Sequence, residues 1–276
     1  MYHSAKSDII HHLEKEAETL TDRIVDNAII YDCVVQDGGR LIHQLLPHAV
    51  GTFEEFTQMR LFSHLQSELR RASRLDVVWD TYQDFSIKGG TRNDRGHGVR
   101  LKVGPKVRIP KDWCGFLRNS NNKMELFRYL ANEVMLRFHT TGDLYITHDD
   151  GKLVGHKGPG VEMLTTCNQE EADIRIVIHV LHALTCGASN VLVKTSDSDV
   201  IVILVHHFPR FNQCSKGCSV MVRFGTGKAQ KLINVRELND GLGPDRSKAL
   251  PLFMALTGCD STSSLKGHSK GQCFNF

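Results

Sequence analysis

Two hydrophobic patterns alternate along the chain. Short runs rich in Ile and Val, bounded by turn residues, are typical of buried strands. They predict strands at 28–35, 75–79, 144–147 and 190–194, and a hairpin of 220–224 with 231–235. Apolar residues spaced three or four positions apart predict helices at 7–25, 40–46, 52–71, 123–138, 170–184 and 250–257. This order predicts the α/β class, with a mostly parallel central sheet that helices cover on both faces.

The segment between the second and third predicted strands is basic. Residues 88–111 contain eight Lys or Arg and one acid, Asp94, a local charge of +7 in a chain whose formal net charge is +3. This concentration of positive charge favours contact with a polyanion, and a solvated loop is the alternative. We therefore expect an N-terminal helical extension at 1–27 and one domain at 28–276, with a basic insertion at about 88–130.

Composition narrows the class of protein. Apolar residues make up 41% and charged residues 24% of the 276 residues, which excludes collagen-like, coiled-coil and disordered chains. The longest apolar run, 200–205, is too short to span a bilayer, so we expect an intracellular protein, nuclear or cytoplasmic, without a membrane partner. The eight cysteines are scattered, which favours reduced thiols. Cys214 and Cys218 are expected to frame a turn, with a zinc site as the alternative.

Acidic residues fall at the ends of predicted strands. In an open parallel sheet, ligand sites gather at the carboxyl ends of the strands. Asp37 follows the first predicted strand, Asp80 ends the second, and Asp197 and Asp199 follow a later one. Residues two apart in an extended strand project to the same side, so Asp197 and Asp199 would repel each other unless a divalent cation lay between them. The alternative is that Asp197-Ser198-Asp199 caps the next helix.

A second acidic group opens the helix predicted at 170–184. Glu170 and Asp173 share a face of a regular helix, whereas a frayed or tight first turn would bring Glu171 and Asp173 together. Acids in a first turn also stabilise the helix dipole, which would be a purely structural role. Asp260 follows the last predicted helix.

Taken in order, these motifs resemble the PIN-like fold of structure-specific nucleases, the flap endonuclease group in particular. That family has an aspartate after each of its first two strands, an acid-Ala-acid step at a helix start, an Asp-x-Asp after a central strand, and a Gly-x-Asp ending a helix. The chain supplies these in the same order as Asp37, Asp80, Glu171-Ala172-Asp173, Asp197-Ser198-Asp199 and Gly258-Cys259-Asp260. The sequence after Leu256 also resembles uncharacterised animal proteins.

The resemblance implies a three-layer α/β/α domain whose basic insertion stands where the family has its phosphate-handling arch. It implies a nuclease with two Mg²⁺ or Mn²⁺ ions that hydrolyses phosphodiester bonds of DNA or RNA, branched or single-stranded. The implied catalytic and metal-binding residues are Asp37, Asp80, Glu171, Asp173, Asp197, Asp199 and Asp260, with Glu170 in reserve. The implied nucleic-acid-binding residues are Lys88, Arg92, Arg95 and Arg100. Of the neighbouring aromatic residues, Tyr82 and Phe85 are candidates for base stacking, whereas Trp79 fits the core better.

Two other functions fit parts of the sequence. A PIN-like scaffold that has lost catalysis would bind nucleic acid or protein. A phosphatase of the haloacid-dehalogenase type also uses an Asp-x-Asp after a strand, but its acidic pair should follow that motif, whereas Asp149-Asp150 precedes it here. The fifteen histidines stand in no nucleophile motif; those at 43, 64, 179 and 182 fit helix surfaces or hydrogen-bonded core positions.

Overall fold

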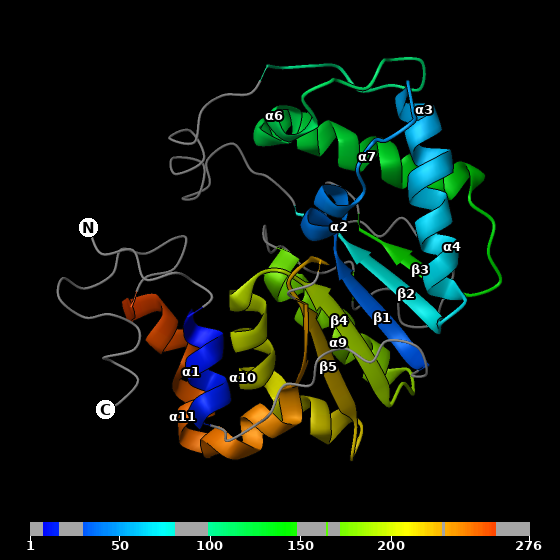
Figure 1. The fold of residues 1–276 in the computed structure, drawn as a ribbon. Helices are drawn as coiled ribbons and strands as arrows, with labels where there is room; N and C mark the ends of the chain where they lie inside the picture. The colour runs from blue at the N-terminus through cyan, green and yellow to red at the C-terminus, as the bar shows by residue number, and fades with distance from the viewer. Residues whose placement is uncertain are drawn as a thin grey trace.

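The described part of the chain is built around one mixed sheet. A computed structural model describes residues 8–16, 30–80, 99–147, 164, 172–227 and 230–257. The strands are β1 (Tyr31–Asp37), β2 (Ala72–Val78), β3 (Asp143–Ile146), β4 (Asn190–Thr195), β5 (Ser219–Phe224) and β6 (Lys231–Asn234). They lie in the order β3-β2-β1-β4-β5-β6 and are parallel except for the β5–β6 hairpin (Figure 1). The predicted α/β class and mostly parallel sheet are confirmed.

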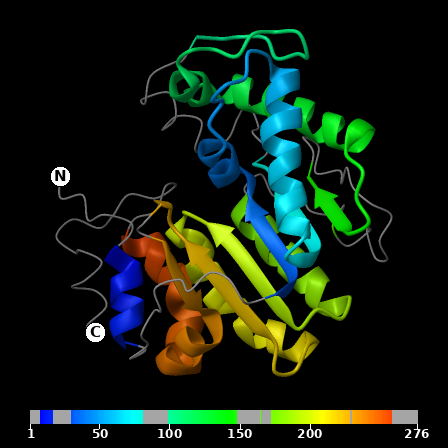
Figure 2. The same cartoon turned by 45° about the vertical axis from the view of Figure 1, so that its right-hand side comes forward.

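Helices cover both faces of this sheet. They are α1 (Asp8–Glu16), α2 (Gly38–Gln44), α3 (Phe53–Phe56), η1 (Thr57–Phe62), α4 (Ser63–Leu69), α6 (Trp113–Arg118), α7 (Ser120–Arg137), α9 (Ala172–Thr185), α10 (Ser198–Cys214) and α11 (Val235–Thr257). Helices α1, α9, α10 and α11 lie on one face of the sheet, and α2, α3, η1, α4, α6 and α7 lie on the other (Figures 1 and 2). Apolar residues of the first group form one hydrophobic cluster with the sheet, and those of the second group form another. The central strands are buried between these layers, which explains their nearly continuous apolar sequences.

Two helices differ from their predicted extents. The helix predicted at 52–71 runs from Phe53 to Leu69, and its middle, η1, is π-helical. The helix predicted at 250–257 is the end of α11, which begins at Val235 and is interrupted at Gly243 (φ 75°). A glycine adopts this left-handed backbone without strain, and the proline that follows it suits the start of a new helical segment.

The N-terminal helix and the end of the predicted basic insertion contribute apolar residues to the two hydrophobic clusters. Ile9, Ile10 and Leu13 of α1 are buried in the cluster that contains α11. Leu126 and Leu130 of α7 are buried in the other cluster, so the predicted insertion boundary at 130 falls inside a core helix. The described part of the N-terminal extension therefore belongs to the same folded unit as the sheet.

Candidate functional site

The carboxyl ends of β1 and β4 lie side by side at the point where the strand order of the sheet reverses. From β1 the chain proceeds outward through β2 and β3, and it then returns to β4 on the other side of β1. Ligands of open α/β sheets bind outside the strand ends at such a switch point. Asp37 is the last residue of β1, and Asp197 follows β4. The topology therefore brings two of the predicted acids to the position where a ligand site is expected.

Asp37 is the predicted ligand on which the charges of two other predicted ligands, Asp80 and Asp197, act. Its Oδ1 accepts a hydrogen bond from the backbone amide of Arg40 (3.1 Å), and its Oδ2 accepts one from Thr195 Oγ1 (3.0 Å). Burial raises the pKa of Asp37 to about 6, and the negative charges of Asp80 and Asp197 add to this effect. The two hydrogen bonds act in the opposite direction without cancelling it. A proton or a cation would relieve this position.

Asp80 borders the same small space as Asp37. It lies two residues beyond the end of β2, and its Oδ1 accepts a hydrogen bond from Ala172 N at the start of α9 (3.2 Å). A methyl group added to Gly39 would lie 3.2 Å from Asp37 Oδ1 and 3.6 Å from Asp80 Oδ2. One oxygen of each carboxylate therefore lies close to Gly39.

The structure decides between the two arrangements that the sequence left open for Asp197 and Asp199, a strand end and a helix cap. β4 ends at Thr195 and α10 begins at Ser198, so Asp199 lies in the first turn of a helix. Asp197 is the N-cap of α10, and its Oδ1 accepts a hydrogen bond from Asp199 N (2.9 Å). The capping alternative is confirmed, as expected for a residue type favoured at this position. The charge of Asp197 nevertheless acts on Asp37.

The remaining predicted ligands are only partly described. Asp173 is half-buried in the first turn of α9, next to Ala172. Glu170, Glu171 and Asp260 lie outside the described residues, as does the Asp149-Asp150 pair. Within the described ranges, no three His, Cys, Asp or Glu residues form a group that could hold a metal ion. Among the predicted ligands that the structure describes, the charges of Asp80 and Asp197 both act on Asp37.

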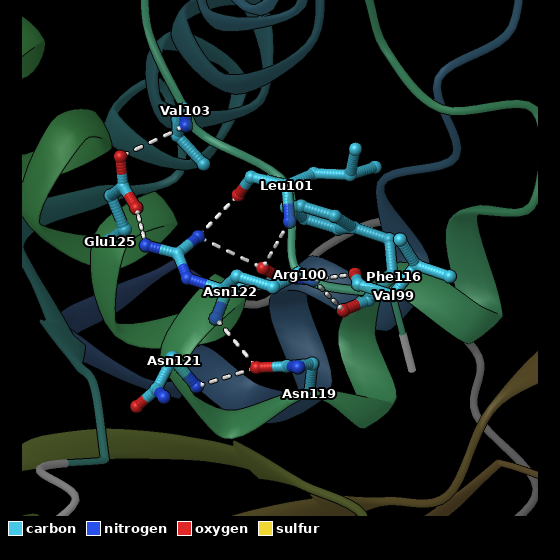
Figure 3. A network of polar contacts seen from close by, with 9 residues as sticks. All are labelled: Val99, Arg100, Leu101, Val103, Phe116, Asn119, Asn121, Asn122 and Glu125. Carbon is cyan, nitrogen blue, oxygen red and sulfur yellow. Dashed lines mark hydrogen bonds and ion pairs between the residues drawn. The ribbon is translucent and has the colours of Figure 1, made fainter. Parts of the chain in front are cut away.

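The side chain of Arg100, which was predicted to contact a nucleic-acid phosphate, is hydrogen-bonded to other residues of the protein. Its guanidinium donates hydrogen bonds to Asn122 Oδ1 (3.0 Å), to the Leu101 carbonyl and to the Glu125 carboxylate (Figure 3). Asn122 is fully buried and in turn donates to the Val99 carbonyl (2.9 Å). Arg100 therefore helps to fix the start of this loop against α7.

The rest of the basic segment divides into an exposed part and an undescribed part. The exposed basic residues are Lys102, Lys106, Arg108 and Lys111. Lys88, Arg92, Arg95, Tyr82 and Phe85 lie outside the described residues. Trp79 is 1% exposed and stacks on Phe127 of α7, with ring centroids 4.5 Å apart, so its predicted place in the core is confirmed.

A group of cations near the carboxyl ends of β4 and β5 was not predicted from the sequence. Lys194 of β4 and Arg223 of β5 are register neighbours, and Lys194 Nζ lies 2.7 Å from both carboxylate oxygens of Glu68 in α4. Arg40 is buried in α2 and donates to the Gly225 carbonyl through Nε (3.3 Å) and Nη2 (3.2 Å). The available signal was a single lysine inside the apolar strand at 190–194, but its acidic partner is far away in the sequence.

A buried ionic network was also missed. Asp76, in the middle of β2, accepts hydrogen bonds from Arg74 Nε and Nη2 (2.7 Å each), and its Oδ2 lies 2.6 Å from His179 Nδ1 of α9. Arg74 also lies over the Tyr145 ring, 4.1 Å from its centroid. The prediction that His179 is a satisfied core histidine is confirmed. Nothing in the local sequence identified Asp76 as its partner.

Cys214 and Cys218 frame a turn, as predicted. The Cys218 amide donates to the Ser215 carbonyl (3.0 Å), and Gly217 between them has a φ of 76°. Cys214 is exposed, whereas Cys218 is buried. The two thiols therefore lie in different environments.

Comparison with known proteins adds no relative to this picture. The sequence matches no protein-family model and no curated protein. None of the described helices is both long enough and apolar enough to cross a membrane. A functional conclusion must therefore come from the geometry at the strand ends.

Proposed function

We propose that the chain is a divalent-metal-dependent nuclease with a PIN-like three-layer α/β/α fold. The observation that carries the proposal is the position of Asp37, a half-buried carboxyl at the switch point of the sheet whose pKa is raised to about 6 by burial and by the like charges of Asp80 and Asp197. Buried acids with structural roles are normally paired with cations, whereas like charges at a ligand-binding position are typical of functional sites. The order of acidic motifs along the chain supports the same conclusion.

Asp37 and Asp80 suit a hard divalent cation because both place a carboxylate oxygen close to Gly39. The hydrogen bonds to Asp37 occupy one lone pair on each oxygen and leave the other available for a metal ion. The further ligands would be Glu171, Asp173, Asp197, Asp199 and Asp260. Bound Mg²⁺ or Mn²⁺ would activate a water for attack on a phosphodiester and stabilise the leaving oxygen.

The chain's own groups prepare this site. Thr195 Oγ1 and the Arg40 amide orient the Asp37 carboxylate. The helices α2 and α10 both begin at the site, and the positive ends of their dipoles offset part of its negative charge. The exposed lysines and arginine at 102, 106, 108 and 111 would neutralise phosphates of a bound strand.

The test is a cleavage assay with labelled single-stranded, flapped and duplex DNA and with RNA, in Mg²⁺, Mn²⁺ or EDTA. We expect metal-dependent cleavage that falls by about a hundredfold or more in Asp37→Asn and Asp80→Asn, because each removes a ligand charge. Asp240→Asn, at an exposed position of α11, is the matched control and should cleave normally. Cleavage that is unchanged in EDTA or in Asp37→Asn would contradict the proposal.

Metal binding gives a second measurement that does not depend on turnover. Mn²⁺ should raise the thermal midpoint of the native protein and of Asp240→Asn, but not of Asp37→Asn. Nucleic-acid binding without cleavage would identify the inactive scaffold instead. Hydrolysis of a small phosphomonoester, but of no polynucleotide, would identify the phosphatase.

A further inference from the structure

Arg175 is a buried cation whose terminal N–H groups have no hydrogen-bond acceptor among the described residues. This residue of α9 is 1% exposed. Its Nη1 and Nη2 atoms are buried, and neither has a hydrogen-bond partner among the residues that the structure describes. A guanidinium stays protonated and carries five N–H donors, so burying it without acceptors is strongly unfavourable. The position therefore calls for an acceptor that the described chain does not supply.

The two other buried arginines within the described ranges have acceptors. Arg74 is 6% exposed and forms a two-pronged ion pair with Asp76. Arg40 is 6% exposed and donates two N–H groups to the Gly225 carbonyl. The fold thus provides acceptors for a buried guanidinium at two positions, and Arg175 differs from both.

Helical geometry relates Arg175 to the acidic site. Arg175 lies three residues after Ala172, on the same face of α9, and the Ala172 amide donates to Asp80 Oδ1 (3.2 Å). Side chains of a helix tilt toward its N-terminus, so the Arg175 side chain extends over the first turn of α9. One turn further on, His179 contacts Asp76 in the middle of β2. Arg175 is therefore one turn nearer the carboxyl end of β2 and Asp80.

We propose that Arg175 binds a phosphate group beside the acidic site. Phosphate oxygens accept two parallel N–H bonds from one guanidinium, which is the geometry that Nη1 and Nη2 offer. The inference rests on the proposed function, in which this phosphate belongs to a nucleic-acid strand and the carboxylates bind the metal ions. Free phosphate and a phosphodiester share the recognised chemistry, and the experiment separates them.

The test compares the native protein with Arg175→Met, Arg175→Lys and the control Arg210→Met, at an exposed position of α10. Thermal midpoints are measured in EDTA with inorganic phosphate, against chloride at equal ionic strength. A short single-stranded DNA is titrated separately in Ca²⁺. Phosphate should stabilise the native protein and Arg210→Met but not Arg175→Met, whose affinity for phosphate and DNA should be about ten- to a hundredfold lower. Lysine keeps the charge without the fork, so its affinity should be intermediate.

The ligand-free proteins supply the readout that a structural role would not give. Replacing an unpartnered buried charge with an apolar side chain of similar size should leave the midpoint of Arg175→Met unchanged or higher. Equal phosphate and DNA affinity in native protein and Arg175→Met would overturn the proposal. If Arg175→Met does not fold, a native phosphate response in Arg175→Lys would overturn it, and a weakened response would support it.

The arms also separate this inference from the nuclease proposal. Phosphate binding that depends on Arg175, without DNA binding, supports the anion site and contradicts the nuclease. DNA cleavage with unchanged KM and kcat in Arg175→Met supports the nuclease and contradicts the anion site.

Discussion

Asp76 is fully buried and Asp37 is half-buried on the adjacent strand, and their surroundings differ. Burial acts to raise the pKa of both, and at Asp76 the hydrogen bonds and charges of Arg74 and His179 more than offset it, so the pKa is lowered. At Asp37 burial and the charges of Asp80 and Asp197 raise the pKa to about 6, although the Arg40 guanidinium also interacts with this carboxylate. The fold therefore compensates a buried carboxylate fully in the middle of β2 but only in part at the end of β1.

This difference separates a structural role from a functional one. A charge-balanced and fully hydrogen-bonded group fixes the position of α9 on the sheet, whereas a group of like charges destabilises the ligand-free protein. Proteins tolerate such destabilisation at sites where a ligand relieves it. The predictions below test the two aspartates and the groups around them.

The largest effect is expected at the compensated aspartate. Asp76→Ala should lower the free energy of unfolding by about 3–5 kcal/mol, because it leaves Arg74 buried without its counter-charge. Urea unfolding measures the change, with Asp240→Ala at the surface as the control, for which less than about 0.5 kcal/mol is expected. A loss at Asp76 as small as that of the control would mean that the network contributes nothing.

Asp37→Asn should act in the opposite direction. The folded-state pKa of Asp37, about 6, lies above the ordinary aspartate value of 3.8, so the native state binds the proton more tightly than the unfolded chain. The stability contributed by the protonated carboxyl is present below about pH 4 and is lost as the pH rises toward 6. In EDTA, Asp37→Asn should therefore equal the native protein at pH 4 and exceed it by on the order of 1–2 kcal/mol at pH 7, since the shift is partly offset by weaker acceptance of two hydrogen bonds. Unfolding curves that keep the same difference at both pH values would disprove this account.

Two substitutions at Asp197 separate its cap from its charge. Asp197→Ala removes the acceptor for Asp199 N and should cost about 1 kcal/mol of unfolding free energy. Asparagine is an equally good N-cap, so Asp197→Asn should be nearly neutral in stability while it lowers the pKa of Asp37. Chemical denaturation checks the first effect, and an NMR titration of the Asp37 carboxyl carbon checks the second. Equal stability of the two variants would exclude the capping role.

The smallest effect concerns Cys33, whose Sγ lies 3.8 Å from Asp76 Oδ1. Burial and the charge of Asp76 raise the pKa of this thiol well above its usual value. Alkylation followed by mass spectrometry should therefore find Cys33 protected in the native protein, whereas the exposed Cys114, Cys186 and Cys214 react. Asp76→Ala should expose Cys33 to alkylation if it loosens the network, and rapid labelling in the native protein would contradict the closed arrangement.

Local patterns were sufficient for the strands and for part of the site, but they did not predict α6 or the part of α11 before residue 250. The β1 strand extends to Asp37, beyond the predicted end at 35, because Gln36 and Asp37 continue the pairing with Val77 and Val78. Asp37 and Asp80 were identified because the carboxyl ends of parallel strands define where a ligand binds. Two arrangements stayed open for Asp197 because an Asp-x-Asp sequence fits either a strand end or a helix cap, and only the turn after Thr195 distinguishes them.

The sequence by itself determined the alternation of strands and helices, since burial of apolar side chains follows the period of each element. Only the tertiary structure decided which charges meet. Asp76 and His179 are 103 residues apart, and Lys194 and Glu68 are 126 residues apart. Such pairs depend on how α4 and α9 pack on the sheet, and no local periodicity encodes that packing. The same packing buries Arg175 near the start of α9. From the sequence alone, a charged residue of this helix would have been assigned to the surface.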